Sequence, residues 1–142
     1  MIITQEKIEI SNKISAEDFC ELRSLVGFQN LTKEQANKVL KNTSYLAVVR
    51  YNNICIGIVR LLFDYGTDAY ITDVIVHPNY QGNGIGKLLV ANVLNYIKNE
   101  CPNTRVACSI YANPDKELFY GKLGFEQLPN SKYGHGMLIE IN

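Results

Sequence analysis

Three glycines at alternate positions are the clearest candidate binding feature of the chain: Gly82, Gly84 and Gly86, followed by Lys87. They stand directly before a stretch with helical periodicity, and the first turn of a helix carries unpaired N–H groups and a partial positive charge. Glycines let a ligand approach those groups closely, and the lysine adds a positive charge. The segment predicts a phosphate or pyrophosphate site; the alternative is a turn that only closes the helix.

The glycine segment differs from two common nucleotide-binding motifs. A dinucleotide fingerprint, GxGxxG, that starts at Gly82 requires a glycine where Lys87 stands. A P-loop requires a glycine at the position of Gln81 and a serine or threonine at that of Leu88. The spacing therefore excludes both motifs, and no nucleoside triphosphate is indicated.

The other reactive side chains give weaker signals. The four cysteines form no CxxC pair and mostly have apolar neighbours, so we expect reduced, buried thiols rather than nucleophiles or zinc ligands. His77 and His135 have no partner at metal-ligand spacing. We expect His77 to be a turn residue and His135 to lie in a late loop, and we expect no metal site.

Charge and hydropathy narrow the class of protein. The chain has 142 residues, and 14 Lys+Arg balance 14 Asp+Glu, which is untypical of a nucleic-acid-binding domain. No apolar run approaches the roughly 20 residues of a membrane-spanning helix. The first residues lack the features of a secretory signal. We therefore expect a cytoplasmic protein with no nucleic-acid partner and no membrane contact.

The elements that must position the glycines follow from sequence periodicity. Apolar spacing and caps predict helices at residues 16–26, 32–40, 84–99 and 116–123. Strands are predicted at residues 2–10, 45–51, 54–63, 69–76, 105–111, 125–128 and 136–141, with a hairpin at Asn52-Asn53. This order predicts an α/β fold of the mixed α+β type, with a mixed, mostly antiparallel sheet of about six to seven strands and helices on both faces.

Two segments carry a family resemblance. The run from Val76 to Leu89 resembles the acetyl-CoA signature of the GNAT superfamily of N-acetyltransferases, whose core reads Gln/Arg-x-x-Gly-x-Gly/Ala and is matched by Gln81, Gly84 and Gly86. A second block, Asn113 followed by Tyr120-x-x-Leu123-Gly124-Phe125, resembles that family's Asn…Phe-Tyr-x-x-Leu-Gly-Phe segment. The resemblance implies a single GNAT-like domain over residues 1–142.

The resemblance also implies acetyl-CoA as cosubstrate and residues that hold it. Backbone N–H groups of residues 82–87 would bind the pyrophosphate, and the main chain of residues 74–76 would pair with the pantetheine arm. Asn113 would form a hydrogen bond near that arm. The implied cofactor-binding residues are Val74, Ile75, Val76, Gln81, Gly82, Asn83, Gly84, Ile85, Gly86, Lys87, Asn113 and Tyr120.

Acetyl transfer to an amine also needs acid–base groups. Tyr120 stands at the family's tyrosine position, and a phenol with a pKa of about 10 is protonated at neutral pH, so we interpret it as the acid for the departing thiolate. A purely packing role is the alternative. Relatives carry carboxylates where this chain has Cys108, or Thr72 followed by Asp73. Asp73 is thus a catalytic candidate that relays a proton through water, or else an anchor for a loop.

These patterns predict an acetyl-CoA-dependent N-acetyltransferase that moves the acetyl group directly to a primary amine. The acceptor is a small amine, an amino acid or a protein amine. A catalytically silent CoA-binding sensor or partner module is the alternative, and transfer of a longer acyl chain is a third interpretation. We expect a monomer or a homodimer.

Overall fold

The computed structural model describes residues 3–142, and the chain forms two compact units, Met1–Ile110 and Tyr111–Asn142. The first unit contains strands β1 (Ile8–Ser11), β2 (Tyr45–Tyr51), β3 (Ile54–Phe63), β4 (Asp68–Val76) and β5 (Ala107–Ile110). Its helices are α1 (Ala16–Leu25), α2 (Lys33–Lys41) and α3 (Ile85–Glu100), with 3-10 turns at Gln5–Lys7 and Pro78–Tyr80. The second unit contains helix α4 (Glu117–Lys122).

The strands form one five-stranded sheet whose order follows the chain, β1-β2-β3-β4-β5. The first three pairs are antiparallel, whereas β4 and β5 are parallel. Parallel neighbours need a crossover connection, and α3 supplies it between β4 and β5. The predicted fold class, a mixed α/β fold with a mostly antiparallel sheet, is confirmed.

Local signals in the sequence explain several element boundaries. Asn52 and Asn53 have φ angles of 50° and 64°, which suit the tight hairpin between β2 and β3. Thr32 forms the expected capping box at α2: its hydroxyl accepts from the Gln35 N–H at 3.1 Å, and the Gln35 side chain accepts from the Thr32 N–H at 2.9 Å. The predicted hairpin and capping box are confirmed.

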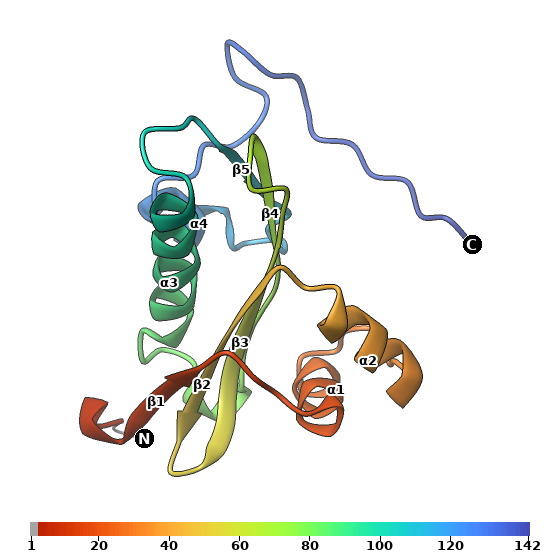
Figure 1. Ribbon diagram of the computed structural model, residues 1–142, viewed down its shortest axis with the longest axis vertical. Helices are drawn as coiled ribbons and strands as arrows, with labels where there is room; N and C mark the ends of the chain where they lie inside the picture. Colours follow the sequence, from red (N-terminus) through yellow and green to blue (C-terminus); the bar gives the residue numbers. More distant parts are fainter. Residues whose placement is uncertain (1–2) are drawn as a thin grey trace. The chain divides into compact units, whose positions relative to one another are not determined.

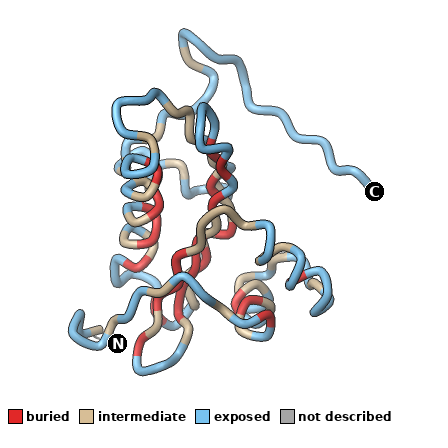
Figure 2. The backbone as a smooth tube through the Cα atoms, viewed as in Figure 1, coloured by how far each residue is buried: buried red, intermediate tan, exposed pale blue. Residues whose placement is uncertain are grey.

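Helices cover both faces of the sheet, as predicted (Figures 1 and 2). On one face, Val48, Ile58 and Ile75 form a buried cluster with residues from α1 and α2, namely Ala16, Phe19, Leu22 and Ala36. On the opposite face, α3 buries Ile85, Leu89, Val90, Val93 and Ile97. The sheet is therefore the middle layer of the first unit.

Gly57 of β3 allows the start of α3 to lie close to the sheet. A Cβ atom there would stand 3.0 Å from Cγ2 of Ile85, 3.1 Å from Cδ1 of Leu89 and 3.3 Å from the carbonyl oxygen of Ile75. These distances are shorter than ordinary van der Waals contacts. The absence of a side chain at Gly57 thus brings β3, β4 and the first turn of α3 together.

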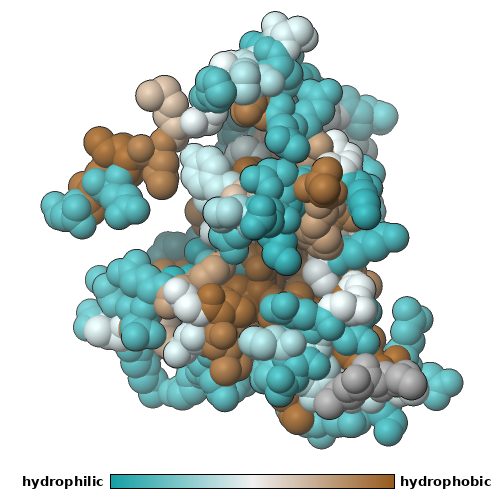
Figure 3. Space-filling model, turned by 180° about the vertical axis from the view of Figure 1, so that it is seen from behind, coloured by the Kyte–Doolittle hydropathy of each residue, from teal (hydrophilic) through white to brown (hydrophobic). Residues whose placement is uncertain are grey.

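The sheet has fewer strands than expected. Residues 125–128 and 136–141 form no strand, which corrects the prediction of about six to seven strands to five. A strand needs a neighbour for its backbone groups, and these two segments join no ladder among residues 3–142. Met137, Leu138, Ile139 and Ile141 are at least 73% exposed, and Figure 3 shows apolar side chains on the surface of this segment.

The N-terminal strand is also shorter than predicted. It begins at Ile8, after the 3-10 turn, whereas the prediction began at Ile2, which lies outside the described residues. None of the helices in residues 3–142 is long and apolar enough to cross a membrane.

Replacing Gly57 with valine should lower the free energy of unfolding by about 1–3 kcal/mol, because the added atoms overpack the junction with α3. Chemical denaturation measures this change. Gly121→Ala in α4 is the control, since a Cβ atom there meets nothing within 4 Å, and it should not lower stability. Equal stability of the Gly57→Val and wild-type proteins would contradict the close packing.

Candidate active site

A β-bulge divides β4 into two parts. Ile58 pairs with Ile75 and Arg60 pairs with Thr72, so Asp73 and Val74 together stand opposite the single residue Val59. Asp73 has a φ of 50°, a left-handed conformation that aspartate tolerates better than most residues. An extra residue in one strand bends it and interrupts the ladder. The bulge thus separates the start of β4 from residues 74–76.

The two parts of β4 have different neighbours on the β5 side. β5 pairs with β4 only from Asp68 to Ile71, so no described residue forms a ladder with residues 74–76 along that edge. On the other side, Ile75 and Val76 stay paired with β3. Strand residues with one free edge can pair with an extended ligand through their main chain. That residues 74–76 pair with a ligand in this way stays a prediction.

The backbone N–H groups of the glycine turn, residues 82–87, have no hydrogen-bond acceptor among the described residues. Gly82 and Gly84 have φ angles of 81° and 78°, and Gly84 is the N-cap of α3. The first backbone bond of the helix runs from the Leu88 N–H to the Gly84 carbonyl at 3.0 Å, and no described residue accepts from the N–H groups of residues 82–87. These amides and the exposed Lys87 form a site that an anion would complete.

Contacts within the first unit fix this turn beside β4. Ile85 is 2% exposed and anchors the start of α3 against β3 near Gly57. The Gln81 side chain donates to the Val76 carbonyl at 3.1 Å, and the Asn83 side chain donates to the Tyr80 carbonyl at 2.9 Å. The structure therefore brings residues 81–87 and 74–76 together.

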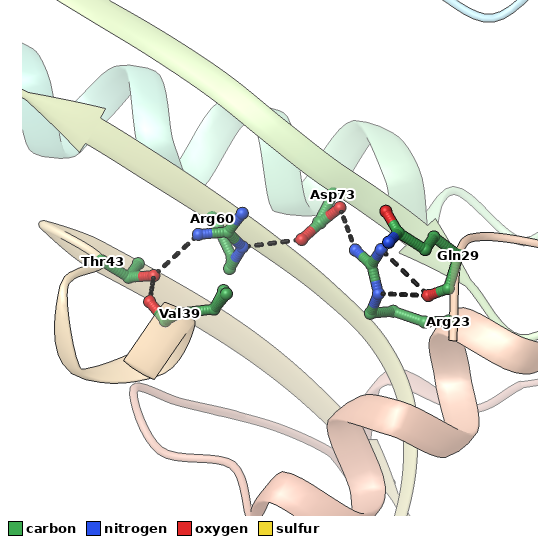
Figure 4. A network of polar contacts seen from close by, with 6 residues as sticks. All are labelled: Arg23, Gln29, Val39, Thr43, Arg60 and Asp73. Carbon is green, nitrogen blue, oxygen red and sulfur yellow. Dashed lines mark hydrogen bonds and ion pairs between the residues drawn. The ribbon is translucent and has the colours of Figure 1, made fainter. Parts of the chain in front are cut away.

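Asp73 is held by two arginines from different elements (Figure 4). The Arg23 Nη1 of α1 donates to Oδ1 at 2.8 Å, and the Arg60 Nε of β3 donates to Oδ2 at 2.7 Å. Arg23 also donates to the Gln29 carbonyl, and Arg60 donates to the Thr43 hydroxyl at 3.0 Å. The Asp73 side chain is only 7% exposed, and both guanidinium groups are 12% exposed.

This geometry favours one of the two roles predicted for Asp73. Each carboxylate oxygen accepts from a charged guanidinium group, and such charge-assisted bonds are shorter and stronger than bonds between neutral groups. The carboxylate ties α1 and β3 to the bulge of β4. The contacts thus support the anchoring role over a proton relay.

The sequence did not predict that Arg23 and Arg60 bind Asp73. They lie 50 and 13 residues from Asp73, so no local spacing connects the three. One signal was available: Arg60 is the only charged residue in the otherwise apolar run of β3. A charge in the middle of a buried strand indicates a buried partner.

The remaining candidates, Asn113 and Tyr120, belong to the second unit. Tyr120 is half-buried, and its ring lies edge-on to Phe119 and Phe125 with centroids 5.0 Å and 5.8 Å away. Burial raises the pKa of the Tyr120 phenol, which therefore keeps its proton at neutral pH. Asn113 is exposed, and its carbonyl accepts from the Lys116 N–H at 3.0 Å.

The histidines and cysteines have other surroundings. His77 caps the 3-10 turn, with Nδ1 accepting from the Asn79 N–H at 3.1 Å, while His135 is exposed. All four cysteines are free and partly buried, and burial raises the pKa of the Cys55 and Cys108 thiols to about 11. Such thiols carry little thiolate at neutral pH, which suits packing rather than nucleophilic catalysis. No cluster of potential metal ligands occurs within residues 3–142.

Asp73→Ala should lower the free energy of unfolding by about 3–5 kcal/mol, because it leaves two buried guanidinium groups without their counter-charge. Asp73→Asn should cost less, since asparagine tolerates the positive φ and keeps an acceptor oxygen. Glu17→Gln, which breaks the exposed pair with Lys33, is the control and should have little effect. Denaturation curves compare the three variants, and a stable Asp73→Ala protein would refute the anchoring role.

Comparison with known proteins identifies the family. Residues 10–139 match the family model described as "Acetyltransferase (GNAT) domain". The chain is 30% identical to an uncharacterized N-acetyltransferase, ycf52, of Pyropia yezoensis, covering 92% of this chain and 80% of the relative. A probable acetyltransferase of Meticillin-resistant Staphylococcus aureus superposes with a TM-score of 0.82 at 30% identity, covering 94% and 99% of the two chains. A GNAT family protein of Streptococcus pneumoniae gives 0.72 at 27% identity, covering 95% and 96%. The chain therefore belongs to the GNAT superfamily of N-acetyltransferases and is an acyltransferase.

Proposed function

We propose that the protein transfers an acetyl group from acetyl-CoA directly to a primary amine. One observation carries the proposal. The N–H groups of residues 82–87 have no acceptor among the described residues, and Gln81 and Ile85 attach this turn to the strands at residues 74–76, whose edge on the β5 side pairs with no described residue. A pyrophosphate needs the first feature, and an extended chain with amide groups needs the second. Coenzyme A contains both groups in one molecule.

The proposed roles of the cofactor-binding residues follow from this match. The amides of Gly82, Gly84 and their neighbours up to Lys87 bind the pyrophosphate, and the Lys87 side chain adds a positive charge. Residues 74–76 pair with the pantetheine arm, and Asn113 bonds to the cofactor near it. We further propose that the two compact units form one domain, because the family match over residues 10–139 includes both.

The reaction itself needs proton transfers. The amine nitrogen forms a bond with the acetyl carbon, the bond from that carbon to sulfur breaks, and the amine loses a proton. A lysine-like amine with a pKa of about 10.4 is almost fully protonated at pH 7, so a base must help. Tyr120 gives a proton to the departing thiolate in this proposal. Because both oxygens of Asp73 accept from arginines, a water molecule is the first recipient of the amine proton in this proposal.

A CoA-binding module without catalysis is the second candidate. It is favoured by Thr72 and Cys108, which stand where relatives carry carboxylates, and by the contacts of Asp73, which leave that carboxylate engaged by two arginines. Release of thiol from acetyl-CoA in the presence of a panel of amines separates the two candidates. Propionyl-CoA and succinyl-CoA in the same assay define the acyl chain length.

Acceptor, assembly and location stay predictions. A small amine, an amino acid or a protein amine fits the proposal, as does a monomer or a homodimer. A cytoplasmic location is expected from the sequence. One relative, 36% identical over 80 residues, is the Arabidopsis thaliana "GCN5-related N-acetyltransferase 2, chloroplastic", so fractionation should include plastids where the source cell has them.

Gly84→Ala should weaken binding of coenzyme A at least roughly tenfold, because a Cβ atom strains the left-handed backbone that aims the amides of the turn. Isothermal titration calorimetry measures the dissociation constant. Gly27→Ala is a matched control: Gly27 has a φ of 77° against 78° for Gly84, and a Cβ atom meets nothing within 4 Å at either position. Both variants should lose similar stability, but only Gly84→Ala should lose affinity. Equal affinities of the two variants would contradict the pyrophosphate site.

Tyr120→Phe should slow acetyl transfer at least roughly tenfold, the lower range of general-acid effects, because it removes the phenolic proton and keeps the ring. Single-turnover thiol release measures the rate, and calorimetry should give an unchanged affinity for acetyl-CoA. Phe119→Leu, which changes the neighbouring ring only, serves as the packing control. Unchanged turnover in Tyr120→Phe would leave Tyr120 with a packing role.

A further inference from the structure

Arg60 and Thr72 form a polar site on the face of the sheet that carries α1 and α2. The Arg60 guanidinium carbon lies 5.9 Å from the centre of the Phe19 ring of α1, which places the side chain on this face. Thr72 pairs directly with Arg60 across β3 and β4. Residues opposite each other in an antiparallel pair share a face, with Cβ atoms roughly 4.5–5.5 Å apart. The two side chains are therefore immediate neighbours.

The ionic network around Arg60 has an excess of positive charge. Two guanidinium groups face the single carboxylate of Asp73, which leaves one positive charge without a partner in the network. The charge is partly withdrawn from water, since each arginine side chain is only 12% exposed. Attraction for an anion is stronger in such surroundings than at a fully exposed surface.

The two arginines differ in what they can still bind. All three guanidinium nitrogens of Arg23 donate, to Asp73 or to the Gln29 carbonyl. Arg60 uses Nε and Nη1, whereas its Nη2 donates to no described residue. Thr72 likewise forms no side-chain hydrogen bond within residues 3–142. Because no buried side-chain nitrogen or oxygen in that range lacks a partner, the Arg60 Nη2 and the Thr72 hydroxyl both reach solvent.

We propose that Arg60 and Thr72 bind an oxyanion, a carboxylate or a phosphate, that is part of the amine acceptor. The inference rests on the proposed acetyl transfer and names the class of acceptor. A guanidinium N–H and a hydroxyl are suitable donors for such oxygens. The site also precedes, by two residues in the same strand, the segment 74–76 proposed to hold the pantetheine arm. The acceptor is therefore an amine with an anionic group rather than a simple alkylamine.

The test uses pairs of acceptors that differ only in the oxyanion. In the first kind of pair, an α- or ω-amino acid from a panel is compared with its amide, which lacks the carboxylate. In the second pair, phosphoethanolamine is compared with ethanolamine, which lacks the phosphate. Thiol release from acetyl-CoA gives kcat/KM, expressed per free amine so that differences in amine pKa cancel. The wild-type protein should prefer the anionic member of one pair at least roughly tenfold, and the preferred pair identifies the oxyanion as carboxylate or phosphate.

Three variants test whether Arg60 and Thr72 cause the preference for the anionic acceptor. Thr72→Val retains the shape of the side chain and breaks no bond of the network, so it should fold normally and reduce the preference at least roughly threefold. Arg60→Gln should abolish the preference. Arg23→Gln is the matched control: it disturbs the same carboxylate but removes no uncommitted donor, so it should retain the ratio. Circular dichroism and affinity for coenzyme A verify folding of each variant.

The outcomes separate the two proposals. Transfer to amines with equal kcat/KM within both pairs overturns the oxyanion site and leaves the transferase function intact. A wild-type preference that survives in Thr72→Val and Arg60→Gln also overturns the site, since another residue then binds the anion. Binding of acetyl-CoA without thiol release from any amine refutes the transferase function and this inference with it.

Discussion

The bulge at Asp73 is the constraint on which the rest of the site depends. It places two residues of β4 opposite one residue of β3, and it falls just beyond the last pair between β4 and β5. Up to Ile71 the strand is an ordinary interior strand, and after the bulge it pairs, among residues 3–142, with β3 alone. The first half of β4 therefore lies inside the sheet, and the second half has an edge on the β5 side that pairs with no described residue.

The second half of the site depends on the close approach at Gly57. Ile85 and Leu89 of α3 and the Ile75 carbonyl of β4 all converge on this residue. The glycine turn is therefore attached through Ile85 to the strands that carry the free edge. Because the amides of the turn and the edge of β4 belong to one packed unit, the coenzyme A proposed above would meet both groups already positioned, which would lower the entropic cost of its binding.

The sequence was informative where the physics is local. The glycine turn, the Asn52-Asn53 hairpin and the capping box at Thr32 each depend on residues a few positions apart, and all three formed as predicted. The arginines around Asp73 come from distant parts of the chain and could not be found by spacing. The strands predicted at 125–128 and 136–141 failed for a related reason, since β propensity describes a segment whereas a ladder requires a partner.

The composition of the network around Asp73 shows that stability alone does not explain it. Replacing a buried ionic cluster with apolar residues of similar volume often leaves the stability of a protein unchanged or raises it by about 1–4 kcal/mol, because no charged groups then lose their hydration on folding. Apolar packing would not, however, fix the direction of a carboxylate at a left-handed residue, as two guanidinium groups do. It would also leave no charge in excess. With one carboxylate between two arginines, the cluster of described residues keeps one positive charge in excess, and the uncommitted nitrogen of Arg60 is where the proposed anion would bind.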